Sequence, residues 1–150
     1  MTRRTKISCY FSPEDGVLEH LVGFIDRCDT GIDAAVYSVT HPEIAEAYAR
    51  ANERSPCRLL MDATQAGGAY SQFDFLRDAG VQVRRDIVTG VMHHKFAIER
   101  DMALLHGSLN WTKNAVERNM ESWIINRYKY VVRLHQARFD YLWLRNQPRD

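Results

Sequence analysis

Short apolar runs alternate with helix-like segments along the first half of this chain, and that order leaves few folds open. The apolar runs cover residues 7–11, 32–39, 58–61 and 81–83, and each is too short to be a helix. Between them, apolar residues recur every three or four positions, which is typical of helices. Strands that alternate with helices favour a parallel sheet covered on both faces.

Capping residues indicate where the first helices should begin. Ser12 can cap a helix, Pro13 suits its first position and Asp15 completes a capping box, so the sequence predicts a helix from Pro13. Residues 40–43 repeat this pattern before a second helix, and a third is expected over residues 71–79. The inward stripe of the second helix should consist of Ile44, Ala47, Tyr48 and Ala51.

The second half of the chain departs from this alternation. Residues 94–98, 102–105 and 123–125 are strand candidates, and an amphipathic helix follows them. The apolar face of that helix is predicted to consist of Val131, Val132, Leu134, His135, Phe139, Tyr141, Leu142 and Trp143. We therefore expect one α/β domain over residues 1–150, with a mixed, largely parallel β-sheet flanked by helices on both faces.

Composition places the chain among ordinary soluble globular proteins, with 45% hydrophobic and 26% charged residues. The net charge is +1, so an anionic partner would have to be attracted by local charge. Three cysteines without Cys-x-x-Cys spacing argue against a disulfide framework or a structural zinc site. No apolar run approaches the roughly 18 residues of a membrane span, and we find no targeting signal or membrane-binding stripe. We expect a cytoplasmic protein without a membrane partner.

One later segment gathers side chains suited to handling a phosphate group. His93 and Lys95 should share a face of one strand, because side chains two residues apart point the same way. Ser108 and Asn110 follow the next strand and offer a hydroxyl and an amide. These four groups together would hold the oxygens of a phosphate.

This segment resembles the phospholipase D superfamily, whose motif is His-x-Lys followed by Gly-Ser-x-Asn. Residues 93–95 and 107–110 carry the match, which is most similar to the single-motif nuclease branch of small bacterial endonucleases and their mitochondrial relatives. The resemblance implies the phospholipase D/nuclease fold, a phosphohistidine formed on His93, and no metal or other cofactor. It implies that Glu121 orients the histidine. The implied phosphate ligands are Lys95, Ser108 and Asn110.

One position departs from the family pattern. The family aspartate would stand five residues after Lys95, but this chain has Arg100 there, between Glu99 and Asp101. Either a bulge lets one of these carboxylates take its place, or a buried contact is lost and the chain is less stable or less active. We expect retained activity, because every group that would touch the phosphate is present.

The family reaction uses two histidines, one as nucleophile and one as general acid, whereas this chain has one His-x-Lys. We therefore predict a homodimer in which a two-fold axis places both His93 side chains across one phosphate. The predicted activity is that of a metal-independent phosphodiesterase, an endonuclease that cleaves DNA or RNA without sequence preference. Two alternatives stay open: a phospholipase D-type lipid hydrolase, and an impaired member that binds nucleic acid without cleaving it.

Four further side chains are candidates for contacts with the substrate. Arg84 and Arg85 suit phosphate geometry, although a solvated turn is an equally good interpretation. Lys113 would contact the nucleic-acid backbone, and Trp111 could stack on a base, although core packing is the more common role of tryptophan. His94 lies beside another histidine, but neighbouring strand residues face opposite ways, so we expect no metal site.

Overall fold

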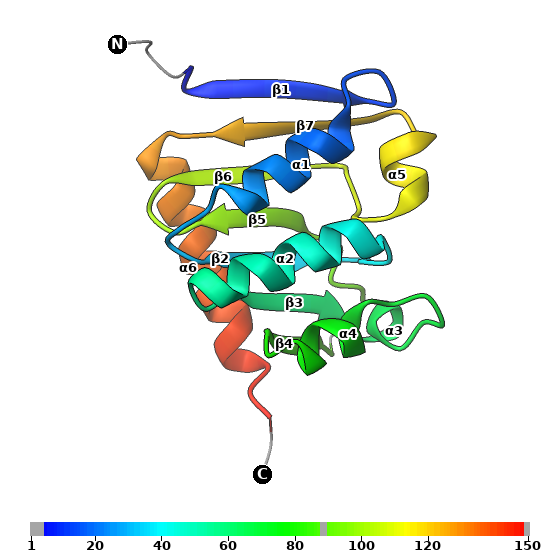
Figure 1. Cartoon of the computed structure of the whole chain (residues 1–150). Helices are drawn as coiled ribbons and strands as arrows, with labels where there is room; N and C mark the ends of the chain where they lie inside the picture. The colour runs from blue at the N-terminus through cyan, green and yellow to red at the C-terminus, as the bar shows by residue number, and fades with distance from the viewer. Residues whose placement is uncertain (1–4, 88–89, 149–150) are drawn as a thin grey trace.

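The computed structural model describes residues 5–87 and 90–148. Its strands are β1 (Ile7–Ser12), β2 (Ile32–Val36), β3 (Arg58–Asp62), β4 (Gln82–Asp86), β5 (Lys95–Glu99), β6 (Ala103–Gly107) and β7 (Glu121–Asn126). Its helices are α1 (Val17–Asp26), α2 (Pro42–Arg54), α3 (Ala63–Ala66), α4 (Phe73–Asp78), α5 (Lys113–Glu117) and α6 (Lys129–Arg145). Figure 1 shows these elements along the chain.

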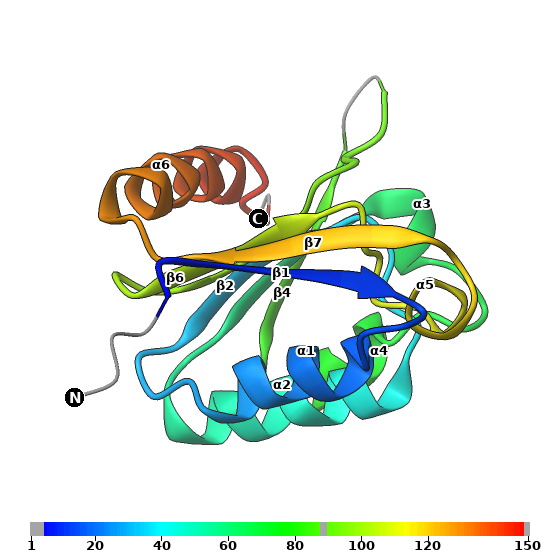
Figure 2. The ribbon, with the colours of Figure 1, turned by 90° about the horizontal axis from the view of Figure 1, so that it is seen from above.

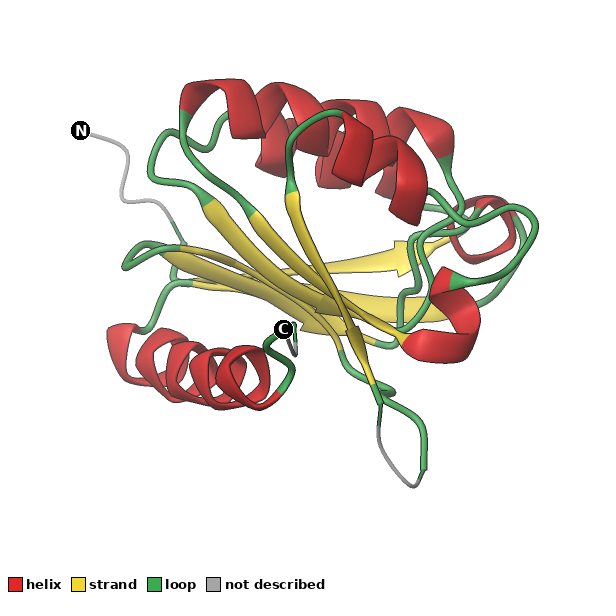
Figure 3. Cartoon of the chain, turned by 90° about the horizontal axis from the view of Figure 1, so that it is seen from below, coloured by secondary structure: helices red, strands yellow, loops and turns green. Residues whose placement is uncertain are grey.

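The strands form one mixed sheet in the order β1-β7-β6-β5-β2-β3-β4. Helices α1, α2 and α4 lie on one face of the sheet, and α6 lies on the other (Figure 2 and Figure 3). The predicted α/β class and the helices on both faces are therefore confirmed. In the described part of the chain, no helix combines the length and the apolar character that crossing a membrane requires.

Parallel pairing is less extensive than the alternating pattern predicted. It is confined to β2, β3 and β4, whereas β5, β6, β7 and β1 all pair antiparallel to their neighbours. The reason for β5 and β6 is the short link between them, residues 100–102, because parallel strands need a crossover of roughly a dozen residues or more. The first strand pairs with β7 at one edge of the sheet, a long-range contact that periodicity does not reveal.

The first helix begins later than its capping residues predicted. It starts at Val17 after Gly16, whose φ of 57° is left-handed and suits glycine. Ser12 is instead the last residue of β1, and its hydroxyl donates to the carbonyl of Asn119 over 2.8 Å. The Asp15 carboxylate accepts the backbone N–H of Phe11, so it closes the turn after β1. The predicted cap failed because both side chains found partners outside the helix.

The second helix agrees with prediction in its position and its inward stripe but not in its cap, because its N-cap residue is His41 and the side chain of His41 makes no capping hydrogen bond. Pro42 occupies its first turn, and its predicted stripe is buried. Tyr48 lies at the centre of that stripe, with its hydroxyl 3.0 Å from the carbonyl oxygen of Ile32 and 2.7 Å from that of Arg58. The hydroxyl therefore links α2 to the starts of β2 and β3.

The last helix is apolar on two sides, whereas a single broad face was predicted. Phe139 and Trp143 are buried against the sheet, as expected. Leu134 and Tyr141, however, are 53% and 56% exposed. At about 100° per residue, these two lie on the side of the helix opposite to Phe139, so they do not widen its buried face.

A buried carboxylate ties β2 to β3, to the link after β5 and to α6. Asp33 is fully buried, and its oxygens accept hydrogen bonds from the guanidinium groups of Arg58 (2.8 and 2.7 Å) and Arg100 (3.0 and 2.7 Å). Gln136 of α6 donates a further bond of 2.9 Å. Burial alone would raise the pKa of Asp33, but these donors outweigh it and lower the pKa.

This cluster gives Arg100 a partner. β5 pairs regularly with both neighbours through Glu99, so the predicted bulge that would admit a neighbouring carboxylate is wrong. Arg100 itself pairs with Asp33, which supplies the acid from β2. The other alternative, a lost contact with lower stability or activity, stays a prediction.

Replacing Asp33 by asparagine should lower the free energy of unfolding by about 2–4 kcal/mol, because two partly buried guanidinium groups lose their counter-charge. Urea titration measures this loss. In wild-type protein the contribution is present above the ordinary pKa of aspartate and is lost as pH falls through the lowered pKa of Asp33, so the two proteins should converge in acid.

The matched control is Asp26→Asn, which breaks the exposed pair with Arg50. That change should cost less than about 1 kcal/mol. Equal losses for Asp26→Asn and Asp33→Asn would contradict the central role of Asp33.

Candidate active site

One edge of the sheet brings the candidate residues together. β5 begins beside the end of β2, since Lys95 pairs with Val36. β7 begins beside the end of β1, since Glu121 pairs with Ser12. β6 lies between β5 and β7 and ends at this edge with Gly107. The ends of β1, β2 and β6 and the starts of β5 and β7 therefore lie together at this edge of the sheet.

His93 and Lys95 meet around a tyrosine. His93 is exposed and lies just before β5 rather than on it, and the centres of its ring and the Tyr37 ring are 4.8 Å apart. The Lys95 ammonium lies 5.1 Å from the centre of the same ring and donates to the backbone oxygen of His93 over 2.9 Å. Burial lowers the pKa of Lys95, and the charge of Glu121 acts against this shift.

His94 belongs to the opposite face of the sheet. The centres of its ring and the Phe96 ring are 5.4 Å apart, on the side covered by α6. Burial lowers the pKa of His94, and the charges of Arg138 and His135 lower it further. The prediction that His94 points away from the candidate site agrees with these contacts.

Glu121 is held by three hydrogen bonds at the start of β7. Its carboxylate accepts the hydroxyl of Ser108 over 2.5 Å and the side-chain amide of Asn119 over 3.2 Å. Its backbone N–H donates to the Ser12 hydroxyl over 3.1 Å. A hydrogen bond from Glu121 to the ring of His93 stays a prediction.

The Gly-Ser-x-Asn segment is shaped by close packing. A Cβ atom on Gly107 would lie 2.6 Å from Cα of Trp123, so only glycine fits against β7. Further along, the N–H of Trp111 donates to the carbonyl of Ser38 over 3.1 Å, which fixes the segment beside the end of β2. Between these anchors, Oδ1 of Asn110 is buried and has no hydrogen-bond partner among the described residues. A buried oxygen without a partner is unusual, and a bound group could satisfy it.

The four further candidates lie in different surroundings. Trp111 is 1% exposed and packs near Tyr48, so core packing is its role and base stacking is not open to it. Lys113 is exposed and lies 3.9 Å from Glu117 of the same helix. Arg84 is half-buried over the Trp143 ring and donates to the backbone oxygen of that residue.

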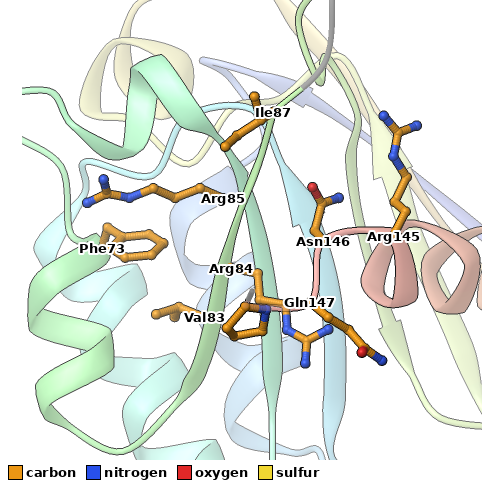
Figure 4. Close-up of a pocket in the computed structure, with 9 residues that line it drawn as sticks. Phe73, Val83, Arg84, Arg85, Ile87, Arg145, Asn146 and Gln147 are labelled. Carbon is orange, nitrogen blue, oxygen red and sulfur yellow. The ribbon is translucent and has the colours of Figure 1, made fainter. Parts of the chain in front are cut away.

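Arg85 is exposed, and its guanidinium carbon lies 4.7 Å from the centre of the Phe73 ring. Both arginines line a pocket of about 600 Å³ between β4 and the end of α6 (Figure 4). The candidate catalytic residues are not among the lining residues of this pocket. The structure therefore places Arg84 and Arg85 apart from the His93 group.

Sequence reasoning missed three residues that support the site. The Tyr37 ring contacts the ring of His93, and Asn119 donates a hydrogen bond to Glu121, but neither residue belongs to the two motifs. Asp62 could have been found, since it ends a buried strand and caps α3. Its other oxygen accepts the N–H of Met92 over 3.2 Å, so it anchors the loop that carries His93.

A mixed α/β domain with a His-x-Lys pair and a Gly-Ser-x-Asn segment at one sheet edge is typical of the phospholipase D-like phosphodiesterases. Residues 21–143 match the family described as "Cardiolipin synthase, PLD-like domain". The chain belongs to this family of phospholipase D-like proteins. In the described residues, no group of three or more His, Cys, Asp or Glu side chains is placed to hold a metal ion.

Relatives of this chain are named cardiolipin hydrolase or phospholipase D. A mitochondrial cardiolipin hydrolase of Xenopus tropicalis is 32% identical over 142 residues, which is 94% of this chain and 68% of the relative. The human mitochondrial cardiolipin hydrolase is 31% identical over 141 residues, which is 93% of this chain and 56% of the relative. A phospholipase D of Rickettsia felis is 31% identical over 123 residues, or 81% of this chain and 62% of the relative.

Solved structures confirm the fold. Nuc from Salmonella typhimurium, a phospholipase D family member, has a TM-score of 0.87 and 23% identity, with 94% of this chain and 95% of that chain covered. NucT from Helicobacter pylori has a TM-score of 0.84 and 23% identity, with 91% and 94% covered. The predicted family and fold are therefore confirmed.

The free energy of unfolding should fall as pH drops below about 6.5, because burial lowers the pKa of His94 and of His106 in the folded protein. The unfolded chain then binds protons that the folded protein binds less readily. The contribution of both groups is present above the ordinary pKa of histidine and is lost as pH falls through the lowered values.

Urea titrations at pH 7 and pH 5 check this expectation. The double variant His94→Gln with His106→Gln should show a smaller difference between the two pH values than wild type. His20→Gln, on the exposed side of α1, serves as the control and should keep the wild-type difference. An undiminished difference in the double variant would rule out these two histidines as its source.

Proposed function

We propose that this protein cleaves nucleic acid as a nonspecific endonuclease, without a metal, through a phosphohistidine on His93 at a homodimer interface. The observation that carries the proposal is the grouping at one sheet edge of an exposed His93, the Lys95 ammonium and the hydrogen-bonded Ser108–Glu121 pair. The Lys95 ammonium lies beside His93, whose side chain is exposed and open to substrate.

The reaction would proceed in two displacements. An imidazole nitrogen of His93 attacks phosphorus, and the bond from phosphorus to one ester oxygen breaks. His93 of the partner subunit, in its protonated form, gives a proton to the leaving oxygen. Water then attacks the phosphohistidine and breaks its phosphorus–nitrogen bond, while the now neutral His93 of the partner subunit takes a proton from that water.

Two copies are proposed because the two roles need two histidines. The chain has one His-x-Lys, and His94 lies on the other face of the sheet. Identical histidines can take opposite roles, since protonation of one raises the cost of protonating the other. Lys95 of each subunit would hold the phosphate oxygens while Glu121 orients the ring of the nucleophile.

Nucleic acid is the proposed substrate because the residues of the motif are most similar to those of the single-motif nuclease branch. A phosphodiester backbone also suits a site built from a cation and hydrogen-bond donors. A lipid phosphodiester is the second candidate, since relatives at 30–32% identity are named cardiolipin hydrolases. The third candidate, binding without cleavage, rests on Arg100, whose guanidinium group pairs with Asp33.

His93→Ala should abolish cleavage of labelled DNA and RNA in the presence of EDTA, by at least about a thousandfold in kcat, because the nucleophile is removed. The melting temperature should be unchanged, since the His93 side chain is exposed. Single- and double-stranded substrates and cardiolipin vesicles are tested in parallel.

His94→Gln is the matched control, because it removes the adjacent imidazole from the other face and should leave cleavage intact. Unimpaired cleavage by His93→Ala would reject the mechanism. Hydrolysis of cardiolipin but not of DNA or RNA would replace the nuclease proposal with the lipid one.

Sedimentation should show twice the 17.4 kDa mass of one chain. Equimolar wild-type and His93→Ala chains, refolded together, should retain about one quarter of the activity of an all-wild-type sample, because only dimers with two histidines are active. Independent subunits would retain about one half. A fully active monomer would contradict the shared site.

A further inference from the structure

The outward side of α6 forms a surface that catalysis leaves unused. We call it the α6 outer face, and its apolar stripe consists of Tyr130, Leu134, Ala137, Tyr141 and Leu144. These residues are spaced by four and three positions in turn, so they lie within about 40° of one line along the helix. The four large side chains are 73%, 53%, 56% and 63% exposed, in chain order.

Cations border this stripe on both sides. Lys129 and Arg133 flank one side and Arg138 and Arg145 the other, and all four are exposed. The one acidic residue of α6, Asp140, lies about 80° from the middle of the stripe, on the margin of Lys129 and Arg133, and its carboxylate accepts hydrogen bonds from Arg58 and Gln136. The α6 outer face is therefore apolar along its middle, and the cations on its two margins outnumber the one acid of the helix.

Of the described helices, α6 is the one that covers the face of the sheet opposite to α1, α2 and α4 (Figure 3). The exposed side chains of the stripe lie on the side of α6 that points away from the sheet. Its opposite side already packs on β5 and β6 through Val132, Phe139 and Leu142. The helix is thus held in place by one apolar side while a second remains exposed. A stripe of this kind is a common mark of an interaction surface.

We propose that the α6 outer face binds the surface of an anionic lipid bilayer, with the helix lying in the plane of the headgroups. Leucine side chains would enter the boundary of the acyl chains, and tyrosines suit the headgroup level. Arginine and lysine on both margins can bury their stems and keep their charges at the phosphates. This departs from the expectation of no membrane-binding stripe, which the sequence suggested when Leu134 and Tyr141 were placed on the same apolar face as Phe139.

Charge and apolar character favour an anionic bilayer over a second copy of the chain and over a polynucleotide. A second copy of the chain would bring a like set of four cations against the first. Asp140, which is already paired with Arg58, and Asp101, which lies beside Lys129 and Arg133, offset this repulsion only in part. A polynucleotide would meet the cations but would give Leu134 and Leu144 no apolar surroundings. The proposal concerns the location of the protein and holds whichever phosphodiester its active site cleaves.

Co-sedimentation of the full chain with vesicles tests the proposal. Wild type should bind vesicles of phosphatidylglycerol and phosphatidylcholine at least about tenfold more strongly than pure phosphatidylcholine, and salt should weaken the binding. Leu134→Ser with Tyr141→Ser should weaken binding about tenfold or more. Arg133→Gln with Arg138→Gln should weaken it about twenty-five-fold, since each cation contributes about fivefold.

The control makes similar changes on the opposite side of the molecule. Arg50→Gln with Phe75→Ser alters an exposed cation on α2 and an exposed aromatic residue on α4, and it should bind vesicles like wild type. Circular dichroism and the melting temperature show that each variant is folded. Cleavage by the same samples is measured separately, so failure of the membrane proposal and failure of the proposed reaction are distinct results.

Three outcomes would overturn the proposal. The first is wild-type protein that does not bind the anionic vesicles, or binds them no better than the two α6 variants do. The second is a loss of dimer mass in Leu134→Ser with Tyr141→Ser, which would identify the face as a contact between copies. The third is an arginine variant that loses oligonucleotide binding and keeps vesicle binding.

Discussion

The buried carboxylate of Asp33 is the constraint on which the rest of this fold depends. A charge with no access to water has to be matched, and two guanidinium groups and an amide from three separate parts of the chain match it. Arg58 opens β3, Arg100 follows β5 and Gln136 belongs to α6. The carboxylate therefore fixes the relative positions of the central strands and of the helix that covers one face.

That arrangement has a consequence for the far edge of the sheet. With β2, β5 and β6 held side by side, the start of β5 is placed beside the end of β6, and Lys95 comes near Glu121 and Ser108. Lys95 and Glu121 are thus held on strands. Ser108 and Asn110 follow β6, and His93 precedes β5 in a loop that Asp62 steadies through the N–H of Met92.

Much of the candidate site could be predicted from the sequence, because the side chains and their spacing are local facts. His93, Lys95, Ser108 and Glu121 do lie at one edge, and Trp111 packs as the commoner role of tryptophan suggests. The errors share a cause. Ser12 was expected to cap a helix but bonds to Asn119 and Glu121, which follow it by more than a hundred residues. No local pattern can show a partner that distant.

The sequence by itself determined the family, the chemical groups at the site and most of the helices and strands, because composition, motif and periodicity express short-range physics. The short helices α3 and α5 were not predicted. Tertiary structure decided which strands are neighbours, that Asp33 is the acid for Arg100, and which side of α6 faces outward. These outcomes depend on burial and on contacts between remote residues. These contacts form only when the chain has folded, so a local sequence pattern cannot predict them.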